Sequence, residues 1–507
     1  MASHTMRNYA RYPRQKYRLP SPRTKTGCFE CRRYRKKCDE HRPICSRCIS
    51  RRIDCHWPDS GPAEEPASQV SSTSDRVQKH ISIQSAPPSP PSLARPCPVS
   101  WGSWDGWSSL GIMKADLTSH SPAFMDQYVR ETSNLLVTVS TKENPFITHL
   151  LPVAANDELI LHSILTLGGA HLDSKHTSAP TRLCVRKHYG RFIHLLREAI
   201  NHFSPDPAKS LIIALSLLML CMIEAFGSIP EAGAISHIRA CQKVVPLLLH
   251  TPSDSTAHGA LLGVALEFYT FISLIISATP YANSTDMEPD TRSPSFIPSR
   301  HILERFRTFG VITARIFPLI ELIPRVISLC QRRQADSASN ECLRANWTEF
   351  HEIIRCIGSF ENQPQMLPSN LCHLEPQDVQ VGKLYVHALT IFTYDAMWGN
   401  ALADSSALVA VVHQHAIAAL DLLPCLLPTR MASILLWPIA IIGSCLISDQ
   451  DRDRFRKALQ GEVQCIPLVQ KLQDILYTLW EKGTTPYYGP SGLQKILLTE
   501  RLTLYLS

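Results

Sequence analysis

From about residue 121 to the end of the chain, apolar side chains recur every three to four positions. The clearest stripe consists of Val185, Tyr189, Phe192, Leu196 and Ile200. This spacing places apolar side chains on one face of an α-helix. Another helix is predicted over 157–172, with Asn156 as its N-cap.

The same period predicts helices over much of the remaining chain. The ranges are 122–140, 208–226, 231–249, 257–278, 301–332, 340–359, 379–399, 402–423, 431–448, 452–460, 466–482 and 491–505. Alternating strand patterns and glycine-turn hairpins are absent from the sequence. We therefore expect an all-α body, built as an antiparallel array of helices, over residues 121–507.

Two apolar runs raise the question of whether they form membrane-spanning helices. The run at 211–226 is interrupted by Glu224 and is shorter than the roughly 20 residues that a spanning helix needs. The run at 431–448 has no charged residue, but it contains Pro438 and Gly443 and lacks flanking basic clusters. We interpret the second run as a buried helix and expect no membrane partner.

The first 120 residues lack this periodicity and divide into three parts. Residues 1–27 are basic and sparsely apolar, which predicts a disordered arm. Residues 28–58 hold six cysteines, and residues 59–120 have the Ser- and Pro-rich composition of a flexible linker. The linker has no heptad repeat, so no coiled coil is predicted beside the cysteines. The expected fold class is all-α, with a small cysteine module, a disordered linker and a large helical regulatory domain.

Positive charge is concentrated near the N-terminus. Residues 1–60 carry 16 Lys/Arg and 5 Asp/Glu, whereas the whole chain carries 51 and 44. The remaining residues therefore hold 35 basic and 39 acidic side chains and are close to neutral. This distribution is typical of a polyanion-binding module attached to a neutral body.

The six N-terminal cysteines form two copies of the pattern C-x2-C-x6-C. They are Cys28, Cys31, Cys38, Cys45, Cys48 and Cys55. Two separate tetrahedral zinc sites need eight thiolates, so six suffice only if two sulfurs bridge both metals. The repeat predicts that the first cysteine of each copy, Cys28 and Cys45, is the bridge. One Zn²⁺ then takes Cys31 and Cys38 as its other ligands, and the second takes Cys48 and Cys55.

Three disulfides or a redox-active pair are the alternative roles for these cysteines. Disulfides need an oxidising compartment, and the polar, basic start of the chain is unlike a secretion signal. A redox pair does not explain two strict repeats flanked by Lys and Arg. We therefore predict a binuclear cluster with two Zn²⁺ per chain.

The two halves of the cysteine module differ in charge. Five of the six residues between Cys31 and Cys38 are cations: Arg32, Arg33, Arg35, Lys36 and Lys37. The corresponding part of the second half contains Ile49 and Ile53. We expect the first half to face DNA, where Arg or Lys can donate to guanine in the major groove, and the second half to pack against the first. Phosphate contacts are expected from Lys25, Thr26 and Lys37.

This segment resembles the fungal binuclear zinc-cluster (Zn2Cys6) transcription factors. The match consists of the cysteine spacing together with Arg32, Arg35, Lys37, Asp39 and Pro43. In that family the residue in the position of Arg35 reads a CGG triplet, so the resemblance implies the same role here. The sequence departs from the family pattern at Tyr34, which stands where a cation is usual.

Two stretches of the helical body resemble the fungal-specific transcription-factor domain. One is 143–172, which opens with Asn-Pro-Phe and ends in Ala-His-Leu. The other is Trp437-Pro438 followed by Gly443. This resemblance implies regulation, response to an effector and self-association, and it does not imply catalysis.

The catalytic motif that the sequence most nearly contains is incomplete. His351-Glu352 begins a zincin-like sequence, but Arg355 replaces the second histidine ligand. We predict a protein that is not an enzyme but a nuclear regulator of RNA polymerase II genes, controlling a metabolic or biosynthetic pathway. Its expected partners are double-stranded DNA, co-regulators and a second copy of the chain through the helical domain. The alternative is a zinc- or redox-responsive interaction protein whose cluster is purely structural.

Overall fold

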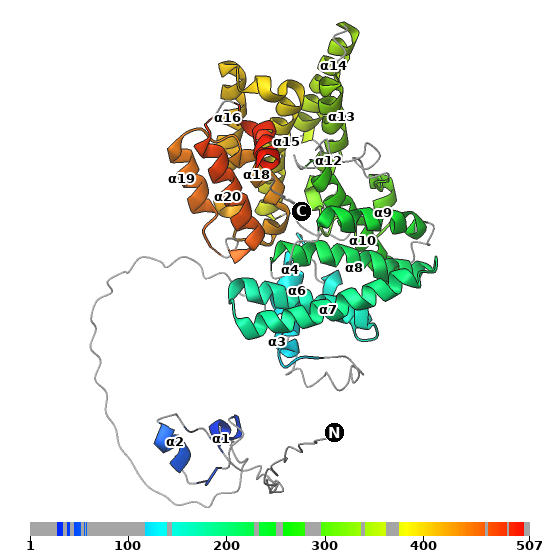
Figure 1. Ribbon diagram of the computed structural model, residues 1–507, viewed down its shortest axis with the longest axis vertical. Helices are drawn as coiled ribbons and strands as arrows, with labels where there is room; N and C mark the ends of the chain where they lie inside the picture. The colour runs from blue at the N-terminus through cyan, green and yellow to red at the C-terminus, as the bar shows by residue number, and fades with distance from the viewer. Residues whose placement is uncertain are drawn as a thin grey trace, which may run out of the picture. The chain divides into compact units, whose positions relative to one another are not determined.

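The computed structural model describes residues 28–33, 38–40, 45–51, 55, 57, 117–138, 144–227, 233–249, 257–278, 296–335, 340–360, 375–461, 465–483 and 486–500. The chain divides at residue 95 into two compact units. The first unit contains α1 (Phe29–Arg33) and α2 (Ser46–Arg51), and the second contains the other helices (Figure 1). Every regular element among the described residues is a helix, which confirms the all-α prediction.

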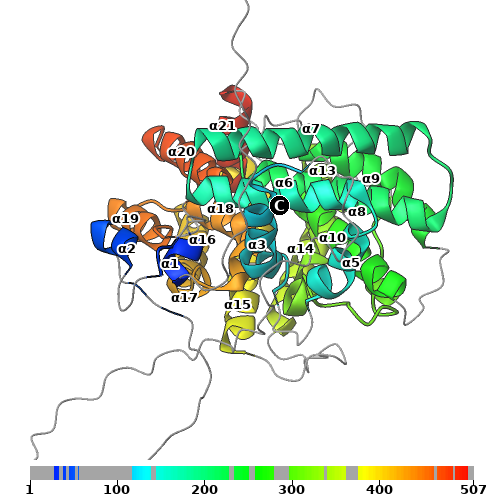
Figure 2. The ribbon, with the colours of Figure 1, turned by 90° about the horizontal axis from the view of Figure 1, so that it is seen from below.

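The second unit begins with a group of helices that pack around α6 and α8. They are α3 (Ser121–Gln127), the π-helix η2 (Tyr128–Thr132), α4 (Ser133–Leu135), the π-helix η3 (Phe146–Leu150), α5 (Leu151–Ala154), α6 (Glu158–Lys175), α7 (Ala179–Asn201), α8 (Pro207–Ala225), α9 (Ala234–Leu248) and α10 (Ala257–Ala278). The central helix α6 contacts α3, α7 and α8 and is buried along most of its length. Its long neighbour α7 lies along the outside of the group (Figure 2).

The remaining helices of this unit gather around α15 (Pro376–Trp398). They are α11 (Arg300–Leu303), the 3-10 helix η6 (Ala314–Ile316), α12 (Phe317–Ile320), α13 (Ile323–Gln334), α14 (Asn340–Ser359), the 3-10 helix η8 (Gly399–Leu402), α16 (Ser406–Leu420), α17 (Leu423–Leu426), the 3-10 helix η9 (Arg430–Ile434), α18 (Leu436–Gly443), α19 (Asp449–Ala458), α20 (Pro467–Glu481) and α21 (Gly489–Thr499). Trp437 of α18 is almost fully buried against Tyr385 and Phe392 of α15. The tryptophan of the Trp-Pro motif is therefore a core residue.

Several helices begin at a side-chain cap. The carboxylate of Asp157 accepts a hydrogen bond from the N–H of Ile160 at 3.0 Å, so the predicted cap of α6 at Asn156 is wrong by one residue. Ser178 and Ser448 cap α7 and α19 in the same way. A cap satisfies one unpaired N–H of the first turn and contributes about 1 kcal/mol.

The prediction of one helix over 301–332 is wrong, because the segment is divided into α11, η6, α12 and α13. Gly310 has a φ of 92°, which ordinary helical residues do not adopt. Pro318 and Pro324 each stand in the first turn of a new helix, where the missing N–H costs nothing. The apolar period of this segment therefore belongs to several short helices.

A buried carboxylate on α10 holds this irregular segment. Glu267 accepts hydrogen bonds from the backbone N–H groups of Gly310 (3.1 Å), Ile312 (3.2 Å) and Thr313 (2.8 Å). It also accepts the hydroxyl of Thr313 at 2.6 Å. From the other side, the backbone N–H of Thr138 donates to the carbonyl of Val311 at 2.9 Å. In a regular helix these peptide groups would form hydrogen bonds with residues four positions away. Here they form hydrogen bonds with residues far away in the sequence.

The apolar run at 431–448 is also not one helix. It is divided between η9 and α18, and all eight residues of α18 are buried. The interpretation of this run as buried is confirmed, although its length as a helix was overestimated. The predicted helices at 122–140 and 402–423 likewise shorten to segments that end at 135 and 420. Of the helix predicted over 491–505, residues 501–505 lie outside the described residues.

Three helices of the described residues are long and apolar enough to cross a membrane: Pro207–Ala225, His258–Ala278 and Ser406–Leu426. Residues 211–225 of the run at 211–226 lie in the first of these, and this helix is longer than the run because it begins at Pro207. The first two are 72% and 94% buried inside the body, which accounts for their apolar composition. The third is 28% buried.

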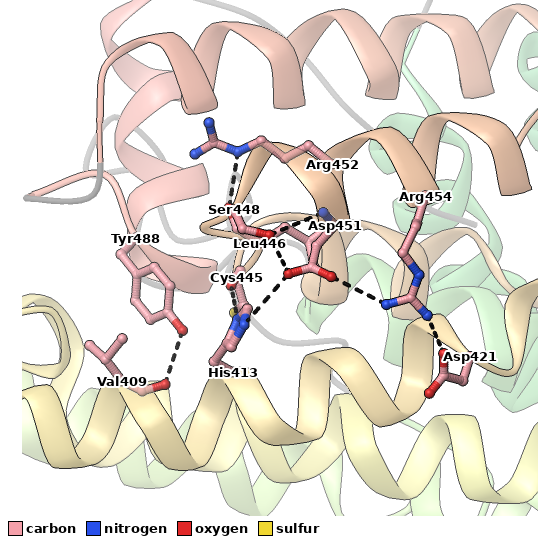
Figure 3. A network of polar contacts seen from close by, with 10 residues as sticks. All are labelled: Val409, His413, Asp421, Cys445, Leu446, Ser448, Asp451, Arg452, Arg454 and Tyr488. Carbon is pink, nitrogen blue, oxygen red and sulfur yellow. Dashed lines mark hydrogen bonds and ion pairs between the residues drawn. The ribbon is translucent and has the colours of Figure 1, made fainter.

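A network of partly exposed polar side chains ties α16 to α19 (Figure 3). Asp451 accepts the hydroxyl of Ser448 at 2.5 Å and lies 3.2 Å from Arg454. Arg454 also pairs with Asp421, which follows α16. His413 of α16 lies 3.8 Å from Asp451. Pairs of this exposure contribute at most about 1 kcal/mol each, so the network orients the helices more than it stabilises them.

Replacing Glu267 by Gln is expected to destabilise the helical unit by about 1–3 kcal/mol, because an amide N–H₂ would face backbone N–H donors in a buried site. Chemical denaturation followed by circular dichroism measures the change. The control is Glu304→Gln, which removes an exposed pair with Arg300. Equal effects of the two substitutions would contradict this role.

The same substitution should alter the pH dependence of unfolding. Burial raises the pKa of Glu267 to about 7 in the folded chain, although its four donors act in the opposite direction. A raised folded-state pKa gives stability that is complete below the unfolded pKa and is lost as pH rises through about 7. The destabilisation by Glu267→Gln should therefore be largest below about pH 4.5 and decrease toward pH 7. A difference that stays constant with pH would contradict the assignment.

Candidate metal centre and nucleic-acid interface

The cysteine module contains two half-sites with the same local geometry. Cys28 directly precedes α1, which carries Cys31, and Cys45 directly precedes α2, which carries Cys48. In each half, the backbone N–H of the second cysteine donates to the sulfur of the first at 3.4 Å. Each half therefore contains one short helix, and the sequence repeat corresponds to a structural repeat.

The sulfur atoms of the two half-sites lie close together. Cys28 Sγ is 3.7 Å from Cys45 Sγ and 3.8 Å from the sulfurs of Cys48 and Cys38, and Cys31 Sγ is 3.6 Å from Cys45 Sγ. A tetrahedral zinc site with Zn–S bonds of about 2.3 Å has S···S edges of about 3.8 Å. The described cysteines form no disulfide, whose sulfurs would stand about 2.05 Å apart. The donor set and spacing therefore fit zinc–thiolate coordination.

The burial of these thiols also favours a metal. Cys28, Cys31, Cys38, Cys45 and Cys48 are buried, and Cys55 is half-buried. Burial raises the pKa of the Cys28, Cys31 and Cys48 thiols. At Cys45 burial acts in the same direction, but hydrogen bonds from neighbouring cysteines outweigh it and lower the pKa to about 6. A bound Zn²⁺ ion supplies the positive charge that stabilises the thiolates, so metal binding and proton release are coupled.

The third cysteine of each half is fixed by the backbone. Cys38 Sγ accepts the N–H of Glu40 at 3.4 Å, and Cys55 Sγ accepts the N–H of Cys45 at 3.5 Å. Glu40 has a φ of 57°, a left-handed conformation in which the chain turns sharply after Cys38. The second contact connects the end of the module to the start of the second half-site.

One face of α1 is cationic. Cys31 points into the cluster, while Arg32 and Arg33 are exposed. The guanidinium of Arg32 lies 5.8 Å from the centre of the Phe29 ring, and Arg33 lies 3.9 Å from Glu30. Arg35, Lys36, Lys37, Lys25 and Thr26 lie outside the described residues, so the structure places two of the five predicted DNA-binding residues and none of the predicted phosphate contacts. Ile53, expected to pack in the second half, also lies outside them, and the side chain of Ile49 is not described.

Asp39 has a role that the sequence analysis did not assign. Its carboxylate accepts the backbone N–H of Ser46, the first residue of α2, at 3.1 Å. It thereby satisfies one unpaired N–H of α2 from the other half-site. The spacing gave no signal of this contact, because a usual N-cap immediately precedes its helix, whereas Asp39 stands seven residues before Ser46.

A compact module of clustered thiolates with a cationic helix, joined in one chain to a large helical domain, defines a class of DNA-binding regulators. Comparison with known families agrees. Residues 26–62 match the fungal Zn(2)-Cys(6) binuclear cluster domain, and residues 123–484 match the fungal specific transcription factor domain. The chain belongs to this family of fungal transcription factors.

Individual relatives match over short stretches. The chain is 41% identical over 63 residues to "Transcription factor lfc1" of Flammulina velutipes, covering 12% of this chain and 22% of the relative. It is 43% identical over 60 residues to "Zn(2)-C6 fungal-type transcription factor afumD" of Aspergillus fumigatus, covering 12% and 16%. It is 34% identical over 98 residues to "Transcriptional regulatory protein moc3" of Schizosaccharomyces pombe, covering 19% and 18%. Each match spans less than a quarter of the relative's length, and no solved structure matches the chain.

The family confirms the main predictions from the sequence. The chain carries both domains of the family, its zinc-cluster domain binds two Zn²⁺ ions, and the family's members are transcription factors and not enzymes. The alternative of a purely structural cluster in an interaction protein is not supported by this membership.

Removing the carboxylate that joins the two half-sites should loosen the cluster. Asp39→Ala leaves the Ser46 N–H without its partner, so we expect a loss of about 0.5–2 kcal/mol and faster transfer of zinc to a chromophoric chelator. Asp39→Asn keeps an acceptor oxygen and should behave nearly as the natural chain does. Unchanged transfer rates for Asp39→Ala would show that the contact does not hold α2.

Proposed function

We propose that this transcription regulator acts in the nucleus and reads CGG-like triplets in the major groove through its first half-site. The observation that carries this proposal is the geometry of α1. Its buried Cys31 anchors the helix at the metal cluster, and its exposed Arg32 and Arg33 start the cationic segment. Metal ligands at both ends of this segment restrict its conformations, so less entropy is lost when a side chain contacts a base.

The cationic residues divide into base readers and phosphate anchors. Arg35 is the primary base reader, since a guanidinium can donate two hydrogen bonds to O6 and N7 of guanine. Lys36 and Arg33 are the next candidates. Arg32, Lys37, Lys25 and Thr26 contact phosphates, and these contacts make binding depend on salt. The family membership supports this division, and the run of five cations in six residues supplies the charge.

Cys28 and Cys45 bridge the two Zn²⁺ ions in this proposal. Cys31 and Cys38 complete one tetrahedral ligand set, and Cys48 and Cys55 complete the other. The support is the position of Cys28 Sγ, which lies within 3.8 Å of a sulfur from each set. The metals make the module rigid, and the contacts with DNA come from the protein's own side chains.

The helical domain regulates this activity in the proposal, through self-association and co-regulators. Control of a metabolic or biosynthetic pathway is proposed from the family resemblance, and genome-wide mapping of bound sites tests it. The kind of relatives that match supports the proposed nuclear location.

The bridging arrangement predicts different zinc losses for two substitutions. Cys28→Ala removes a ligand from both metals, so native mass spectrometry should find no bound zinc. Cys31→Ala removes a ligand from one metal, and the other should remain at equal chelator concentration. Two zinc ions on the Cys28→Ala chain would exclude bridging by this residue.

The role of Arg35 predicts a loss of base preference. Arg35→Ala should weaken binding to a CGG-containing duplex by about 1–3 kcal/mol, or roughly 5- to 150-fold, and should change binding to a scrambled duplex little. Gel-shift titrations at fixed salt measure both. The control is Arg51→Ala, which removes an exposed cation from α2. Equal weakening on both duplexes would reduce Arg35 to a phosphate anchor, and no salt-dependent binding by the natural chain would reject the proposed reading of DNA.

A further inference from the structure

The helical unit contains a cavity of about 610 Å³. One wall comes from residues that follow or lie on η2, α4, α6 and α8, and the opposite wall comes from η9, α18 and α20. Cavities that hold small molecules are typically 300–1,000 Å³. The size of this one therefore suits a metabolite and is too large to be a packing defect.

The floor of the cavity is apolar and well ordered by packing. Phe226, Leu436, Ile439 and Val469 are buried residues of its lining. The ring of His171 stacks on Phe226 with centroids 4.8 Å apart. An apolar molecule in this space would be removed from water at about 25 cal/mol for each Å² buried.

The two walls contact each other beside the cavity. The cavity therefore exists without any movement of one wall toward the other. Gly227, at the end of α8, has a φ of 64° and lies against Pro467, the first residue of α20. A Cβ at Gly227 would lie 2.6 Å from the Pro467 ring, too close for any other residue. The glycine is therefore required for this approach of α8 to α20.

Cations stand at the polar part of the lining. Lys175 Nζ lies 2.5 Å from Glu131, and Arg430 Nη2 lies 3.0 Å from Glu375. Lys175, Glu131 and Arg430 line the cavity. A guanidinium has five N–H donors, so Arg430 can bind Glu375 and a second anion together. Burial lowers the pKa of His171 to about 4, so this ring is neutral at pH 7. The charge of the cavity lining therefore comes from Lys175, Arg430 and Glu131.

The hydroxyl groups of the lining are already engaged. Ser174 donates to the carbonyl of His171 at 2.7 Å, Thr429 to that of Leu426 at 2.6 Å, and Ser433 to that of Arg430 at 3.3 Å. Each hydroxyl has a single O–H, so these residues cannot donate to a ligand without losing a bond in the protein. None of these three hydroxyls is therefore available to donate to a ligand, whereas the two cations keep spare N–H donors.

We propose that this cavity binds a small molecule with an apolar body and one anionic head group, with the head group held by Arg430 and Lys175. A molecule of this kind contacts both walls. Its binding therefore joins the group of helices around α6 to the group around α15. The proposal concerns the helical unit and holds whichever base triplet the zinc cluster reads.

Two fluorescent probes isolate the contribution of the head group. They are 1-anilinonaphthalene-8-sulfonate and N-phenyl-1-naphthylamine, which share the same apolar body and differ in the sulfonate. Both are titrated into the full chain, with unfolding curves recorded for every variant. The variants are Arg430→Gln and Lys175→Gln for the head group, Ser433→Trp to fill the cavity, and Arg325→Gln as the control. Arg325 is ion-paired with Glu349 at 2.8 Å and does not line the cavity.

We expect the sulfonate probe to bind at least tenfold more tightly than the neutral one. Arg430→Gln and Lys175→Gln should each weaken the sulfonate probe about tenfold, the loss of one charge-assisted hydrogen bond, and leave the neutral probe within about twofold. Ser433→Trp should weaken both probes, and Arg325→Gln should change neither. Hydrogen exchange of η9 and of the end of α6 should slow when the sulfonate probe binds to the natural chain.

Three results would overturn the proposal. Equal affinity for the two probes would reject a role for the head group. An effect of Arg430→Gln no larger than that of Arg325→Gln would reject Arg430 as its contact. Hydrogen exchange that slows elsewhere but not in η9 or α6 would place the probes outside the cavity. This measurement uses the natural chain, so it remains valid if Ser433→Trp fails to fold.

Discussion

The close approach of buried sulfurs is the constraint on which the N-terminal unit depends. Its two helices have five and six residues, too few to be stable alone. The core of its described part consists of cysteines, against which Cys55 and Trp57 pack. With so little apolar surface to bury, this unit takes its folding free energy from the metals, and the position of the cationic helix follows from the sulfurs that anchor it.

The sequence predicted this module well because thiolate ligands are few, and their number and spacing leave little freedom. It predicted the helical body well where apolar residues repeat on one face. It failed at 301–332, where the peptide groups of Gly310, Ile312 and Thr313 bond to Glu267, a residue more than 40 positions away. A local pattern carries no information on such bonds. Asp39 was missed for the same reason, because its partner Ser46 lies in the other half-site.

The residues that line the cavity could not be grouped from the sequence. Lys175 and Arg430 lie 255 positions apart in the chain, and neither belongs to a motif. They line one space only because η9 packs near α4 and the end of α8 meets the start of α20. By contrast, the cations proposed to contact DNA lie within six consecutive residues, so a common function can be proposed for them without a fold.

The two units differ in the physical source of their stability, and so in their response to pH. In the cluster, zinc binds the thiolate form of each cysteine, so protons compete with the metal and acid weakens the module. In the helical unit, burial raises the pKa of Glu267 to about 7, so its contribution is complete at acid pH and is lost as pH rises. Acidification is therefore expected to weaken the zinc module while the Glu267 contact of the helical unit is retained. The pH dependence of the two units thus differs in sign, because one depends on ionised thiols and the other on a protonated carboxyl group.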